Sequence, residues 1–204
     1  MAGAHEHLER AEHVEHAAHG HGDANRTNKR IALLIAVLAL FLAIAETLGK
    51  GAQTEALNYN VEASNLWAFF QAKTIRQTAV RTAAETIELT RPQITDPAVA
   101  DAVAKRLDTW GKTVARWESE PETQEGRREL SARAKQAETK RDTALARYHH
   151  YEVSSAAFQI AIVLASAAVI TGAMLLAFIA MGVGGVGLVF AGIGLVAPHS
   201  VHLF

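Results

Sequence analysis

One stretch decides the fold: residues 156–197 read AAFQIAIVLASAAVITGAMLLAFIAMGVGGVGLVFAGIGLVA. It contains no charged residue in forty-two positions, whereas one helix needs only about 20 apolar residues to cross a bilayer. The stretch therefore predicts two membrane helices joined by a turn, which we expect at 181–185, where glycine is densest. These would be a transmembrane helix over 156–181 and a Gly-rich membrane helix over 182–198 that is short for a full crossing.

A second apolar block lies near the N-terminus, where residues 31–48 read IALLIAVLALFLAIAETL. Eighteen residues make a helix of roughly 27 Å, enough to span most of the hydrocarbon core. Polar residues 1–30 precede the block and no AxA-like cleavage site follows it, so it reads as a retained first transmembrane helix rather than a leader. The tail at 1–30 is expected to be disordered or partly helical.

Residues 49–155, between the two blocks, have the composition of a helical stalk. Asp96 and Pro97 form a cap and a first-turn proline, which start a helix over 97–118. Three faces recur at helical spacing: Ala68, Ala72, Ile75, Ala79, Ala83 and Ile87; Val99, Val103, Leu107, Trp110, Val114 and Trp117; and Leu130, Ala134, Ala137, Arg141, Ala144, Tyr148 and Tyr151. Legs over 52–90 and 121–155 have similar lengths, which suits an antiparallel stalk.

The sequence thus predicts an all-α membrane protein with three transmembrane segments and a long antiparallel helical stalk outside the bilayer. Twenty Lys and Arg against twenty-one Asp and Glu give a net charge of −1, so the composition does not favour a nucleic acid partner. Three cations before the first span and four at the stalk ends favour opposite orientations, which leaves topology open. The absence of cysteine excludes disulfides and thiol catalysis.

The N-terminal tail is rich in histidine interleaved with glutamate. Its six histidines are His5, His7, His13, His16, His19 and His21. Imidazole and carboxylate suit Zn, Ni or Cu, so weak metal binding is one interpretation. A solvated polar leader is the other, because no zinc-protease motif fixes the geometry. We expect no other cofactor.

Glu46 is an acidic residue at the end of the first span, and Lys50 follows four residues later on the same helical face. An intramembrane carboxylate is costly and usually marks a partner, a pore or a proton site. The pair is interpreted as an interfacial ion pair, with a ring of Glu46 around an oligomer axis as the alternative.

Two further groups of residues indicate helix packing or oligomerisation. Gly184, Gly187, Ala191 and Gly194 recur at spacings of three and four, which lets another helix approach closely within the hairpin or between subunits. Trp67, Phe69 and Phe70 point in three adjacent helix directions and favour contact with another helix or subunit.

The segment ASNLWAFFQAKTIRQT, which begins at Ala63, follows ETLGKGAQTEALNYN at the end of the first span. With the His-rich N-terminus, the early span and the C-terminal hydrophobic pair, it resembles an uncharacterised family of bacterial membrane proteins, domain of unknown function four-three-three-seven. The resemblance covers nearly the whole chain. It implies a multi-pass protein of the bacterial inner membrane and supplies no catalytic residue.

No catalytic constellation is present in the sequence, so we expect a non-enzymatic, self-associating integral membrane protein that acts as a scaffold or assembly factor. Its expected partners are membrane lipids, further copies of the chain and a membrane-protein partner. An oligomeric ion channel with Glu46 near the pore is one alternative. A metal-responsive accessory protein that acts through the N-terminal histidines is another.

Overall fold

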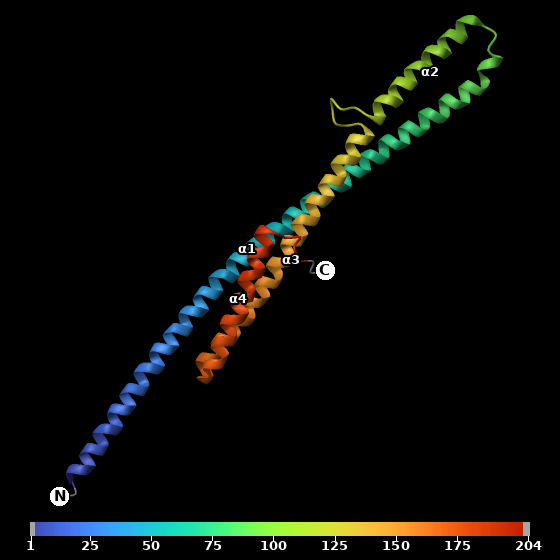
Figure 1. Cartoon of the computed structure of the whole chain (residues 1–204). Helices are drawn as coiled ribbons and strands as arrows, with labels where there is room; N and C mark the ends of the chain where they lie inside the picture. Colours follow the sequence, from blue (N-terminus) through green and yellow to red (C-terminus); the bar gives the residue numbers. More distant parts are fainter. Residues whose placement is uncertain (1–2, 202–204) are drawn as a thin grey trace. The chain divides into compact units, whose positions relative to one another are not determined.

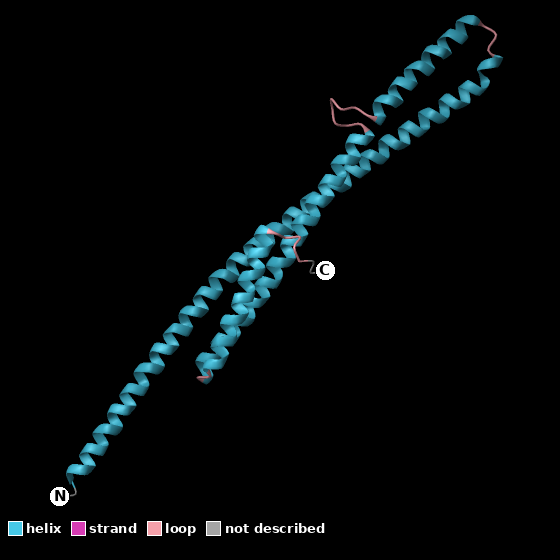
Figure 2. Cartoon of the chain, in the orientation of Figure 1, coloured by secondary structure: helices cyan, strands magenta, loops and turns pink. Residues whose placement is uncertain are grey.

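The structure, a computed structural model, describes the backbone of residues 3–201 and the side chains of residues 26–201. Over these residues the fold is helical and has no strand (Figure 2). The elements are α1 (Gly3–Thr90), a short 3-10 helix η1 (Arg91–Gln93), α2 (Pro97–Glu118), α3 (Arg127–Thr171) and α4 (Met174–Val196) (Figure 1). The all-helical prediction is confirmed.

The chain divides into two compact units, which we describe separately. The apolar unit comprises Met1–Gln53 and Leu145–Phe204, and the polar unit comprises Thr54–Ala144. Each long helix α1 and α3 contributes one part to each unit.

In the polar unit, α1 and α3 run antiparallel. Asn60 is hydrogen-bonded to Arg141, and Trp67, further along α1, is bonded to Glu138, which lies earlier on α3. Leu130, the first buried apolar residue of α3, packs with Ala63, Leu66, Ala134 and Ala137 of the shared core. The row predicted from Leu130 onward is therefore the buried face of α3 in this unit.

The small-residue face that the sequence predicts on α1 is not buried within this unit. Ile75 is 69% exposed, and the buried row instead contains Ala63, Leu66, Lys73 and Gln77. Two members of the true row are polar, so a search for apolar residues alone selects a different face. Burial of these polar side chains is tolerated because they find partners on α2, on α3 or in the loop that joins them.

Helix α2 begins and ends where the sequence predicts. The Asp96 carboxylate accepts a hydrogen bond of 2.8 Å from the Ala98 amide, and Pro97 occupies the first turn. The predicted second leg begins later than expected, because residues 119–126 form a loop and α3 starts at Arg127 rather than at 121. Glu129 in the first turn of α3 accepts from the Ser119 hydroxyl at 2.7 Å, which fixes this loop.

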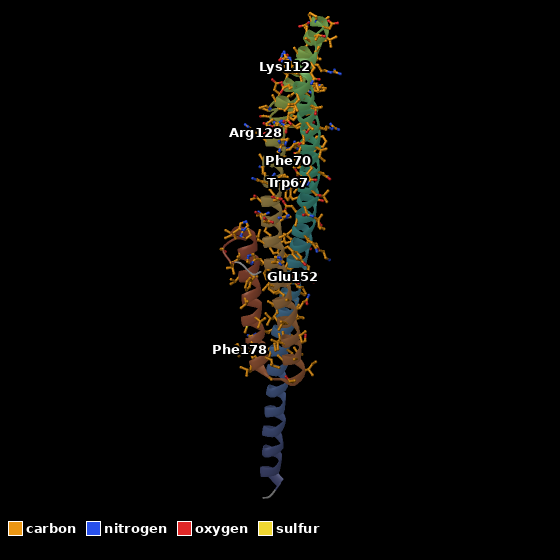
Figure 3. The ribbon with its side chains drawn as sticks, turned by 90° about the vertical axis from the view of Figure 1, so that its right-hand side faces the viewer. Trp67, Phe70, Lys112, Arg128, Glu152 and Phe178 are labelled. Atoms are coloured by element: carbon orange, nitrogen blue, oxygen red, sulfur yellow. The ribbon has the colours of Figure 1, made fainter. Side chains whose placement is uncertain are left out.

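In the apolar unit, α1, α3 and α4 meet through small residues. Ala161, Ala165 and Ala168 on α3 and Ala177 and Ala180 on α4 are buried. Many large apolar side chains lie on the outside, among them Leu33, Val163, Ile170, Leu175, Phe178 and Val196, although Ile31, Leu38 and Phe158 are buried; Phe178 is labelled in Figure 3. Small residues inside and large apolar residues outside are typical of helices packed in a bilayer.

The turn in the second apolar block is at Gly172 and Ala173, so the turn predicted at 181–185 is wrong. Gly172 has φ +70°, a conformation that favours glycine. Consequently the helix predicted over 156–181 ends at Thr171, and α4 has 23 residues instead of the short segment 182–198. Within residues 26–201, three helices, α1, α3 and α4, are long and apolar enough to cross a membrane.

The first apolar block, predicted as a separate helix over 31–48, is one part of α1. This helix continues through Gly49, whose position is buried against Tyr151: a Cβ at Gly49 would lie 3.5 Å from the Tyr151 Cβ. The backbone upstream is helical from Gly3.

Candidate functional site

A groove lined by both charged and apolar residues opens in the apolar unit where the apolar block of α1 ends and the charge-free part of α3 begins. Its volume is about 290 Å³. The groove is lined by Ala45, Glu46, Gly49, Lys50, Gln53, Tyr148, Tyr151, Glu152 and Ser155. The structure therefore brings the predicted pair Glu46 and Lys50 into one groove, together with residues of α3.

Glu46 is exposed on the bundle, and its carboxylate accepts a hydrogen bond of 3.4 Å from the Gln159 amide. Gln159 lies within the charge-free stretch of α3 and also approaches the Ser155 hydroxyl at 3.5 Å. Glu152, on the other side of the groove, is 3.7 Å from His149 Nδ1. Sequence reasoning missed Gln159, although a lone amide in an apolar run was a signal that could have found it.

The glycine face of α4 packs against helices of the same unit. A Cβ at Gly187 would lie 3.0–3.2 Å from the Phe158 ring, and one at Gly194 would lie 3.1 Å from His150 and Tyr151. At Gly184 there is no room for a Cβ, because it would lie 2.7 Å from Leu38 Cδ2 of α1. Ala191 is half-buried. Of the two arrangements that the sequence left open, the described chain uses this face for packing within the hairpin and against α1.

Two buried polar side chains of α3 join α3 to the C-terminal part of the apolar unit. The Ser154 hydroxyl donates to the Gly187 carbonyl at 2.8 Å, and His150 Nε2 lies 3.0 Å from the Pro198 carbonyl. His150 is 1% exposed and Tyr151 is 4% exposed. His150, Tyr151 and Ser154 therefore lie inside the bundle of the apolar unit.

The polar unit contains a second polar cluster, which we call the polar junction: Gln77 of α1, Glu118 of α2 and Arg127 of α3. Arg127 Nη1 donates to the Gln77 carbonyl oxygen at 2.7 Å and to Glu118 Oε2 at 2.8 Å. The Gln77 amide nitrogen also donates to Glu118, at 3.2 Å. One glutamine that is 1% exposed thus connects three helices.

These contacts stabilise the ionised form of Glu118. The hydrogen bond from Gln77 and the charges of Arg127 and Arg128 hold the pKa of Glu118 below the usual range of a glutamate, against an opposing effect of desolvation. The hydrogen bond from Ser119 likewise lowers the pKa of Glu129. Glu118 forms ion pairs with Arg127 and Arg128. Glu129 accepts hydrogen bonds from the Ser119 hydroxyl and the Glu120 amide of the preceding loop.

The aromatic group of α1 contacts Arg127 of the polar junction through Phe70; Trp67 and Phe70 are labelled in Figure 3. The Trp67 indole donates to Glu138 of α3 at 2.9 Å and meets Phe70 edge to face, with ring centroids 5.4 Å apart. The Arg127 guanidinium covers the Phe70 ring at 4.9 Å. Trp67 and Phe70 therefore contact α3 of the same chain, whereas Phe69 is 50% exposed.

The six histidines of the tail, from His5 to His21, lie outside the residues whose side chains are described. Among the described side chains, no group of three or more His, Cys, Asp or Glu is arranged to hold a metal ion. The metal hypothesis therefore concerns the tail alone.

No curated protein and no solved structure matches this chain. A family model does match, over residues 27–197. The matched region contains the whole of α2, α3 and α4. It also contains the groove and the polar junction. The chain belongs to the family described as Domain of unknown function (DUF4337).

Proposed function

We propose that the chain is a non-enzymatic, self-associating integral membrane protein of the bacterial inner membrane that acts as a scaffold or assembly factor. In this proposal the apolar unit is the anchor, because its large apolar side chains suit contact with lipid. The polar unit is a stalk outside the bilayer, because its outer surface carries ion pairs such as Asp101–Lys105 and Asp108–Lys112.

The observation that carries self-association is a set of large apolar side chains left exposed in the polar unit. They are Leu57, Val61, Phe69, Ile75, Leu89 and Val99, and their exposure ranges from 48% to 80%. Five of the six are on α1 and Val99 is on α2. In a unit that faces water, such exposed apolar residues usually mark a surface covered by another protein. Four of the six, Leu57, Val61, Ile75 and Leu89, share one side of α1.

The proposal is tested by the subunit count of the full-length chain. The protein is extracted in mild detergent, reconstituted into nanodiscs and weighed by native mass spectrometry. We expect a defined multiple of the 21.9 kDa chain that is the same in both environments. Nanodiscs assembled at a ratio of several chains to each disc, but found to contain a single chain each, would overturn the proposal.

A channel is the second candidate, and the groove is the observation that favours it. Glu46 and its partner Gln159 are exposed polar residues beside the apolar part of the bundle. In an oligomer, carboxylates at this position would attract cations to the axis. Ion flux through reconstituted liposomes distinguishes this candidate from a scaffold.

A further inference from the structure

One side of α1 in the polar unit, which we call the free face, consists mostly of apolar residues and has no charged one. It is the row Leu57, Val61, Ser64, Ala68, Ala72, Ile75, Ala79, Thr82, Thr86 and Leu89, at successive spacings of three or four residues. Nine of these ten residues are exposed and Ala72 is half-buried. The buried row that contains Ala63, Leu66 and Gln77 lies elsewhere on the same helix.

The outer face of α2 shows what a solvated helix face looks like in this protein. Asp101 pairs with Lys105 and Asp108 pairs with Lys112, both at 2.7 Å and both four residues apart. The free face of α1 contains no such pair and no ionisable side chain over thirty-three residues. A surface of this length in water favours a covering partner over hydration.

We propose that the free face binds the free face of a second copy, so that two α1 helices pair in parallel about a two-fold axis. This inference rests on the proposed self-association and names its surface. Copies inserted in one membrane share an orientation, so their α1 helices run in the same direction. A two-fold axis then places each residue of the row opposite its own counterpart.

The composition of the free face suits this self-contact. A row without charges meets itself without like-charge repulsion, which ionised side chains facing their own copies would create. Ala68, Ala72 and Ala79 allow the two backbones to approach closely, while Leu57, Val61 and Ile75 supply apolar area. Spacings of three and four keep the row on one seam over most of its length.

The size of the contact is also sufficient. Thirty-three residues of α-helix extend roughly 50 Å. A strip about 10 Å wide on each copy gives a total buried area on the order of 1,000 Å², near the lower bound of specific interfaces. The shared anchors raise the effective concentration of the two copies, which compensates for a modest area.

Because the chain contains no cysteine, single cysteines report the contact directly. Full-length Val61→Cys, Ala68→Cys, Ile75→Cys and Ala79→Cys variants are oxidised in membranes. Glu62→Cys and Arg81→Cys are matched controls, since both positions are exposed on other sides of α1. We expect disulfide-linked homodimers at the four face positions, formed at least about tenfold faster than at the controls.

Two results would overturn the inference, and they differ in what they leave standing. Equal or greater cross-linking at the controls, in a protein whose mass shows an oligomer, would place the interface elsewhere and leave the proposed function intact. A monomeric mass together with no cross-link at any position would remove both. Trapping of a different protein at Ala68→Cys, without homodimer, would assign the free face to another partner.

Charge substitutions provide a test that does not depend on disulfide geometry. Ala68→Glu should weaken association on the order of tenfold, and Ala68→Glu mixed with Ala68→Lys should restore it as a heterodimer. Ala132→Glu is the matched control, because Ala132 is an exposed alanine on α3. Unchanged association of Ala68→Glu, with helix content preserved by circular dichroism, would contradict the inference.

Discussion

At the scale of single residues, the apolar unit is held together by positions that lack a side chain or carry a methyl group. Gly187 faces the ring of Phe158, which is 1% exposed, and its carbonyl accepts the Ser154 hydroxyl. Gly185, two residues earlier, has no atom of a neighbouring helix within 4 Å of where a Cβ would be. Of these two glycines, only Gly187 packs closely against another helix. Their spacing in the sequence does not distinguish the two.

We predict that Gly187→Ala destabilises the apolar unit and Gly185→Ala does not. The new methyl at 187 would lie 3.0–3.2 Å from a buried ring, and overpacking of this kind typically costs about 1–3 kcal/mol. At 185 the methyl meets open space, and helix propensity favours alanine by up to about 1 kcal/mol. Unfolding by SDS in mixed micelles, followed by circular dichroism, measures both. Equal loss in the two variants would contradict the tight contact at Gly187.

At the scale of helices, the ends of α2 were predictable and the faces of α1 were not. The Asp96–Pro97 start follows from local capping rules that a sequence states directly. The buried face of α1 depends on which polar residues find partners across the bundle, and Gln77 finds them on α2 and α3. A single sequence contains no information on such pairings until the helices have been placed.

The polar junction should make the stability of the polar unit depend on pH. Because the folded pKa of Glu118 is lowered, its stabilisation is fully present above the ordinary glutamate pKa of about 4.3. It is lost as the pH falls through the folded pKa. We expect Glu118→Gln to reduce stability by roughly 1 kcal/mol at neutral pH, a modest value because the carboxylate is partly exposed.

Thermal unfolding of the full chain at several pH values checks this expectation through tryptophan fluorescence. The difference between the natural chain and Glu118→Gln should shrink as the pH is lowered from about 6 to about 3. Glu122→Gln serves as control, because Glu122 is exposed in the neighbouring loop. A difference that is constant over this range would show that the charge of Glu118 does not contribute.

At the scale of the whole molecule, the sequence predicted which helices can cross a membrane better than it predicted where the turn between them lies. Charge-free stretches identified the helices that can cross a membrane, because hydropathy is a property of composition. The turn was misplaced because glycine serves both turns and close helix packing, and among the glycines of residues 26–201 only Gly172 has a positive φ. In the groove, the nearness of Glu46 and Lys50 follows from their spacing along α1, whereas Glu152 joins them only through the fold. The same holds for Gln159, which donates a hydrogen bond to Glu46.

The last prediction separates the scaffold from the channel. The full chain is reconstituted into liposomes and monovalent cation flux is followed with an entrapped dye. For a scaffold we expect flux equal to that of protein-free liposomes, both for the natural chain and for Glu46→Gln. The structure gives a reason for this expectation: the Glu46 carboxylate already accepts the Gln159 amide of the same chain and lies in a groove between two helices of one bundle.

Flux that requires the Glu46 carboxylate would contradict the scaffold and favour the channel. Gln53→Glu is a useful companion variant, because it adds a carboxylate to the same groove and should increase cation flux if the groove faces a conducting axis. Charge at the axis of a pore changes conductance, whereas charge in a groove that faces lipid headgroups changes only local hydration. A pair of opposite responses, loss in Glu46→Gln and gain in Gln53→Glu, would therefore place this groove on an ion pathway.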